Sequence, residues 1–128
     1  MSVRVVRLGT PRERGEGLRI GTVRRPPRGI RKSEFATRNY FDVWFPDLAP
    51  GAATIARLKA GTGTGGWAAF VRCYRAEMAR PEASRALDLL AALSHSADFS
   101  VGCYCEEEAH CHRSVLAALL RERGARLG

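Results

Sequence analysis

The residues that could do chemistry in this chain are concentrated in one short segment, GCYCEEEAHCHRS, at positions 102–114. It contains three of the four cysteines and two of the three histidines, beside three consecutive glutamates and one arginine. Thiols and imidazoles so close together can bind a metal ion, form a nucleophile with its general base, or act beside an anion held by arginine. They are also compatible with packing alone, because a buried cysteine behaves as a small apolar residue.

The residues on either side of this segment predict the elements that position it. The run FSVGCYC over 99–105 has the length and apolar character of a buried strand. Residues 111–123 have helical periodicity, with an inward stripe formed by Val115, Leu116, Leu119 and Leu120. Cys105 is therefore predicted at the carboxyl end of the strand, and Cys111 in the first turn of the helix.

A helix N-terminus presents unpaired backbone N–H groups and the positive end of the helix dipole, which favour an anion or a thiolate. Cys111 and His112 each lie four residues before a member of the inward stripe, so both are expected to point toward the end of the strand. We therefore predict Cys105, Cys111 and His112 as catalytic residues, with either thiol as a nucleophile beside the imidazole. Arg113 follows on a different side of the helix, where it could hold an anion.

Two other interpretations of the cluster stay open. One is a zinc site, since Cys103, Cys105, Cys111 and His112 supply enough ligands. Against it, the sequence lacks the paired Cys-x2–4-Cys knuckles of the usual structural zinc sites. The other is packing, in which Cys103 belongs to the core and Cys111 extends the apolar stripe of the helix.

The net charge of +8 resides in the arginine-rich N-terminal third, residues 1–38, which holds ten arginines and one lysine against three glutamates. Its loop RRPPRG follows a predicted strand, and proline and glycine restrict the backbone around Arg28. We predict that Arg24, Arg28 and Gly29 join Arg113 in binding a small phosphorylated or nucleotide-like anion.

A nucleic-acid-binding module that uses the whole arginine-rich third is the alternative. Diffuse binding of this kind would draw equally on Arg28 and on Arg12 and Arg14, which are expected in a freely solvated loop. A steep dependence of binding on salt would distinguish it from a single anion pocket.

The rest of the chain supplies the elements of one domain over residues 1–128. Short β-branched runs at 3–8 and 18–23 predict strands, and residues 51–94 predict helices, with a flexible connection at GTGTGG over 61–66. Together with the later strand and helix, they predict an α/β fold: a small, mostly parallel sheet with helices packed on it in Rossmann-like layers. Ligands of such folds bind at the carboxyl ends of the strands.

The composition predicts a cytoplasmic protein with no membrane partner. No apolar run approaches the ~18 residues that span a bilayer, and the start, MSVRVVRLGT, lacks the apolar stretch of a signal peptide. In a reducing compartment the four cysteines are expected to be free thiols, metal ligands or catalytic groups rather than a disulfide framework.

Two stretches taken together resemble a known family: PRGIRKSEF at 27–35 and CEEEAHCHRSVLAALLRERG at 105–124. They are similar to the domain-of-unknown-function family 488, in particular to its short YeaO-like members, and the similarity extends over almost the whole chain. The resemblance implies a compact cytosolic bacterial α/β domain with an enzyme-like cluster, without naming a reaction or a substrate. Gly51 departs from the family pattern, which often has a serine at the start of the following helix.

Overall fold

The computed structural model describes residues 1–60, 63–104 and 111–128. In these residues the sheet has four strands, all parallel, in the order β1-β4-β2-β3. The strands are β1 (Val3–Arg7), β2 (Leu18–Gly21), β3 (Val43–Trp44) and β4 (Phe99–Cys103). The small parallel sheet and the α/β class predicted from the sequence are therefore confirmed.

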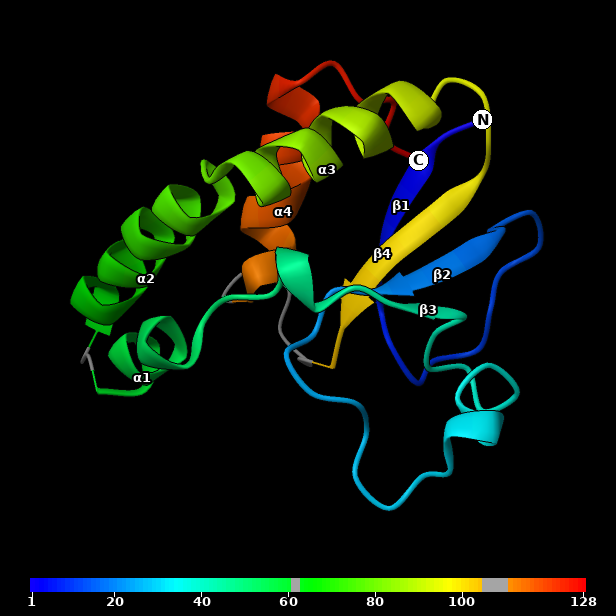
Figure 1. Ribbon diagram of the computed structural model, residues 1–128, viewed down its shortest axis with the longest axis horizontal. Coiled ribbons are helices and arrows are strands. Elements are labelled where there is room, and N and C mark those ends of the chain that lie inside the picture. Colours follow the sequence, from blue (N-terminus) through cyan, green and yellow to red (C-terminus); the bar gives the residue numbers. More distant parts are fainter. Residues whose placement is uncertain (61–62, 105–110) are drawn as a thin grey trace.

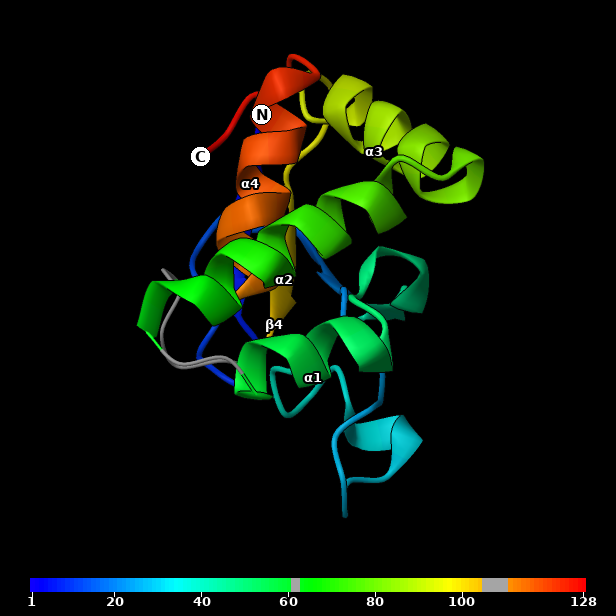
Figure 2. The same ribbon diagram turned by 90° about the vertical axis from the view of Figure 1, so that its left-hand side faces the viewer.

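The α-helices in the described residues lie on one side of this sheet, as two perpendicular views show (Figures 1 and 2). They are α1 (Ala52–Ala60), α2 (Gly63–Met78), α3 (Pro81–Leu93) and α4 (His112–Glu122). Helix α4 packs against β1 and β4, and both α2 and α3 contact α4. None of the helices in the described residues has the length and apolar composition needed to cross a membrane.

The core between the helices and the sheet follows the apolar stripes of the sequence. Phe70, Tyr74 and Met78 of α2 are buried against Val101 of β4 and Leu116 of α4. The hydroxyl of Tyr74 donates a 2.6 Å hydrogen bond to the carbonyl of Leu48, at the end of the short 3-10 helix Pro46–Leu48. Burial raises the pKa of Tyr74 well above its ordinary value, so this hydroxyl stays a donor.

Helix α2 begins earlier than the sequence pattern predicts. The glycine-rich stretch 61–66 was expected to be a flexible connection, but residues 63–66 form the first turn of α2. The apolar stripe that starts at Trp67 packs α2 into the core, and each residue added to the end of an existing helix costs less than a new nucleus. Extension by one turn therefore overcomes the low helix propensity of glycine. Residues 61–62 lie outside the described residues.

The face of the sheet away from the helices is covered by loops, which are anchored by a buried ion pair. Arg19 of β2 is 1% exposed and Glu16 is 2% exposed. Arg19 Nε and Nη2 donate to the two carboxylate oxygens of Glu16 over 2.5 and 3.1 Å. Its Nη1 donates to the carbonyls of Thr10 and Asn39, at 2.8 and 2.7 Å, so one guanidinium joins two loops to the sheet.

A second ion pair corrects the expectation that Arg12 is freely solvated. Both terminal nitrogens of Arg12 donate to the carboxylate of Asp42, over 2.8 and 3.1 Å. The backbone N–H of Arg19 donates to the same carboxylate at 2.8 Å. Desolvation alone would raise the pKa of Asp42, but these hydrogen bonds and the nearby positive charges lower it below its ordinary value. No local sequence pattern indicates this pairing, because thirty positions separate Arg12 from Asp42.

Candidate functional site

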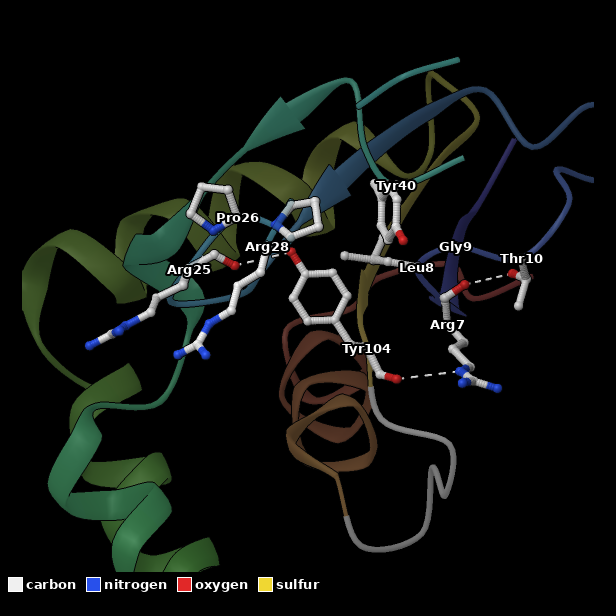
Figure 3. Close-up of a pocket in the computed structure, with 10 residues that line it drawn as sticks. Arg7, Leu8, Gly9, Thr10, Arg25, Pro26, Arg28, Tyr40 and Tyr104 are labelled. Atoms are coloured by element: carbon white, nitrogen blue, oxygen red, sulfur yellow. Dashed lines mark hydrogen bonds between the residues drawn. The ribbon is translucent and has the colours of Figure 1, made fainter. Parts of the chain in front are cut away.

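A cleft of about 610 Å³ lies at the carboxyl ends of β1, β4 and β2 (Figure 3). Strand β1 ends at Arg7, β4 is followed by Tyr104, and the loop after β2 carries Arg25 and Arg28. The lining residues are Arg7, Leu8, Gly9, Thr10, Arg25, Pro26, Pro27, Arg28, Tyr40 and Tyr104. Because parallel strands bring their carboxyl ends to one edge, segments far apart in the sequence meet in this cleft.

Three exposed arginines surround Tyr104 in this cleft. Arg25 and Arg28 lie side by side on one side of the tyrosine, and Arg7 lies on its other side (Figure 3). Arg7 Nε donates to the backbone carbonyl of Tyr104 over 3.3 Å, which holds its guanidinium beside the cleft. The guanidinium group of Arg7 points away from the other two (Figure 3). Neighbouring guanidinium groups such as those of Arg25 and Arg28 can bind the oxygens of one phosphate or carboxylate group.

Tyr104 also fixes the loop that carries the two neighbouring arginines. Its hydroxyl donates to the backbone carbonyl of Arg25 over 3.0 Å, and its ring meets Tyr40 edge to face, with 6.1 Å between centroids. Burial, with smaller contributions from Tyr40 and Cys103, raises the pKa of Tyr104 far above its ordinary value. The tyrosine therefore remains a neutral donor at physiological pH. Gly29, with φ of +74°, turns the loop directly after Arg28.

Two cysteines lie beneath the cleft in a small apolar cluster with Leu8, Val23 and Phe41. Cys103 at the end of β4 and Cys111 at the N-cap of α4 are each 1% exposed. Their Sγ atoms are 2.7 Å apart. Leu8 belongs to this cluster, Tyr104 packs against it, and both also line the cleft, so the cluster and the cleft adjoin.

The imidazole of His112 is held in one orientation. Its Nε2 is 2.8 Å from the carbonyl of Thr22 and 3.3 Å from the hydroxyl oxygen of the same residue. A carbonyl can only accept, so we assign the ring proton to Nε2. Nδ1 then carries the lone pair, and it lies 3.8 Å from Cys111 Sγ. The hydroxyl of Thr22 donates in turn to the carbonyl of Gly102, at 3.0 Å.

The structure brings together only some of the residues predicted from the sequence. Cys111 and His112, at the start of α4, are adjacent to Cys103, at the end of β4. Cys105 lies outside the described residues. Arg28 lines the cleft and Gly29 follows it, but Arg24 is not among the lining residues. Arg113 is 4% exposed and is not among them either, so it does not converge with Arg28 on this cleft.

Sequence reasoning missed Arg7, Arg25, Tyr40 and Tyr104. A signal was present for two of them, since Arg7 and Tyr104 each lie one position before the end of a predicted strand, at 3–8 and 99–105. Residues at the carboxyl ends of neighbouring parallel strands are candidates for a common site. Tyr40 reaches the cleft from an irregular segment, and no periodic pattern could have placed it there.

A protein-family model described as the active DUF488-N3 subclade matches residues 3–124. The match therefore includes all four strands, the arginine loop and the segment that joins β4 to α4. No curated protein and no solved structure matches the chain significantly.

Proposed function

Since a match of this extent means that the chain belongs to the DUF488 family, we propose that this member binds a phosphorylated or nucleotide-like anion in the arginine cleft. The observation that carries the proposal is the placement of Arg7, Arg25 and Arg28 around one cleft at the carboxyl edge of the sheet. Arginine suits this task because its planar fork of donors matches phosphate oxygens.

The dimensions and lining of the cleft support a ligand of nucleotide size. Its volume of about 610 Å³ is within the usual range of small-molecule sites, roughly 300–1,000 Å³. The ring of Tyr104 lies between the arginines, and Tyr40 is next to it (Figure 3). Aromatic rings beside cationic groups can receive a base and its phosphates together.

A single anion site explains the charge better than diffuse binding of nucleic acid. Part of the arginine excess is already neutralised within the fold: Arg12 pairs with Asp42, and Arg19 pairs with Glu16. Arg4 also pairs with Glu13, at 3.4 Å. The positive charge that remains exposed is therefore smaller than the composition indicates, and part of it is collected around the cleft.

The proposal assigns no reaction. The family description calls the subclade active, which supports an enzyme but names no chemistry. The catalytic role of Cys111 and His112 stays a prediction, because both are buried and neither is among the residues that line the cleft.

The proposal is tested by calorimetric titration with inorganic phosphate, pyrophosphate and ATP. We expect Arg28→Ala to weaken binding of the best of these ligands by about tenfold, the loss of roughly one charge-assisted hydrogen bond. Arg14→Ala is the matched control, because Arg14 is also exposed and is not among the residues that line the cleft. Equal losses of affinity in the two variants, together with a steep salt dependence of binding, would overturn the proposed anion site in the cleft and support binding of nucleic acid.

A further inference from the structure

The side-chain cluster beneath the cleft points to a second site, and we infer that Cys103 Sγ, Cys111 Sγ and His112 Nδ1 bind a divalent metal ion of the zinc class. The ligand atoms of these residues all lie within 4.8 Å of one another. Two thiolates and an imidazole are a donor set that zinc prefers. The site uses none of the arginines of the proposed function, so each can fail without the other.

One distance between ligand atoms is close to that of a tetrahedral metal site, and a second must lengthen. With Zn–S of about 2.3 Å and Zn–N of about 2.0 Å, a sulfur and a nitrogen on one ion are roughly 3.5 Å apart, and two sulfurs roughly 3.8 Å. Cys111 Sγ and His112 Nδ1 are already 3.8 Å apart. The two sulfurs, at 2.7 Å, must separate by about 1 Å.

The surroundings of His112 are those of a metal-binding histidine. Such residues usually donate their second ring nitrogen to a carbonyl or carboxylate, which fixes the tautomer and directs the lone pair at the ion. Here the carbonyl of Thr22 accepts from Nε2, which leaves Nδ1 facing the sulfur of Cys111. The backbone N–H of Thr22 donates to the carbonyl of Gly102 in β4 at 2.9 Å. The sheet therefore holds Thr22, and with it the carbonyl that accepts from His112.

The ligands come from rigid elements and are almost fully buried. Cys103 ends the central strand β4, Cys111 is the N-cap of α4, and His112 is its first residue. Their exposed fractions are 1%, 1% and 7%. An ion here would join the end of β4 to the start of α4 and support Tyr104, the neighbour of Cys103 that lines the cleft. Metal binding would therefore stabilise the fold directly.

Metal content and cobalt spectroscopy test this site on the full chain. Protein purified without chelator should contain zinc in an amount equal to the protein. Replacement by Co²⁺ should give visible d–d bands and a sulfur-to-cobalt charge-transfer band, which report tetrahedral thiolate coordination. Wild-type protein that takes up neither metal, or that shows a Cys103–Cys111 disulfide in a non-reducing peptide map, would overturn the inference.

Ligand variants identify the donors. Cys103→Ser, Cys111→Ser and His112→Gln should each lose zinc and the charge-transfer band. Cys73→Ser is the matched control, because Cys73 is a half-buried cysteine of α2 outside the cluster, and this variant should retain both. If a ligand variant does not fold, the thermal midpoint of the wild type with and without a chelator replaces it: the chelator should lower the midpoint. An unchanged midpoint, or zinc retained by a folded ligand variant, contradicts the assignment.

Discussion

The hydroxyl of Tyr104 donates a hydrogen bond to the backbone carbonyl of Arg25 across 3.0 Å, and so joins the end of β4 to the loop that carries Arg25 and Arg28. The two residues are seventy-nine positions apart in the sequence. This contact gives the arginine loop a fixed point on the sheet, which the loop's own proline and glycine residues cannot supply. Preorganisation of this kind reduces the entropy lost when a ligand binds.

Removal of this hydroxyl should weaken anion binding without unfolding the protein. We expect Tyr104→Phe to raise the dissociation constant for ATP by about fivefold, since one neutral hydrogen bond contributes roughly 1 kcal/mol. Tyr40→Phe, which removes the hydroxyl of the other tyrosine in the cleft and leaves the Arg25 contact in place, is the control. Calorimetric titration measures the affinity of both variants for ATP. Equal affinities would show that the hydrogen bond from Tyr104 to Arg25 does not organise the arginine loop.

In the loops on the far face of the sheet, substitution of the buried ion pair between Glu16 and Arg19 should lower the free energy of unfolding most. Glu16→Gln leaves the guanidinium of Arg19 without its counter-charge, and removal of one partner from a buried pair typically costs about 3–5 kcal/mol. Glu13→Gln, at a highly exposed glutamate of the same loop, should change the free energy of unfolding by less than about 0.5 kcal/mol. Urea unfolding measures both values.

The ion pair between Glu16 and Arg19 also predicts how the free energy of unfolding depends on pH. Desolvation raises the pKa of Glu16, but the bonds from Arg19, the backbone of Glu13 and Ser100 outweigh it, so the pKa in the folded state is below 4.5. A lowered folded pKa contributes stability that is present above the unfolded value and is lost as pH falls toward the folded one. Stability should therefore decline below about pH 4.5, and Glu16→Gln should show a smaller decline. An identical pH dependence in the two proteins would exclude this role.

Helix α1 is capped by a residue from α2. The backbone N–H of Gly51 and the hydroxyl of Thr54 both donate to the carboxylate of Glu77. This arrangement compensates for the absence of a serine at Gly51. We expect Glu77→Ala to cost about 1–2 kcal/mol, as for the loss of an N-cap, whereas Arg72→Ala on the exposed side of α2 should cost almost nothing. Thermal unfolding would reveal the difference.

The reactivity of Cys111 separates a metal ligand from a nucleophile. In the zinc-loaded protein we expect iodoacetamide to alkylate Cys111 more slowly than Cys73, because Cys111 is 1% exposed and its sulfur is bound. Removal of the metal should accelerate the reaction, and ATP should not affect it. Fast alkylation of the zinc-loaded protein that ATP prevents would instead support the catalytic role predicted from the sequence.

The sequence predicts the elements of this fold better than the contacts between them. Apolar periodicity places Tyr74 and Leu116 in the core, and the short apolar run ending in Cys103 predicts the central strand, because these patterns are local. The partners of Arg12 and Arg19 depend on how loops fold back over the sheet, which no local pattern encodes. For the same reason the sequence predicts Arg28 near an anion site but misses Arg25.

A crystal structure of the complex with the tightest-binding nucleotide or phosphate tests the central claim most directly. We predict that phosphate oxygens lie within hydrogen-bond distance of the guanidinium groups of Arg25 and Arg28, with the ligand against the ring of Tyr104. A ligand bound instead at the N-terminus of α4, or only on arginines that do not line the cleft, such as Arg14 and Arg24, would contradict it.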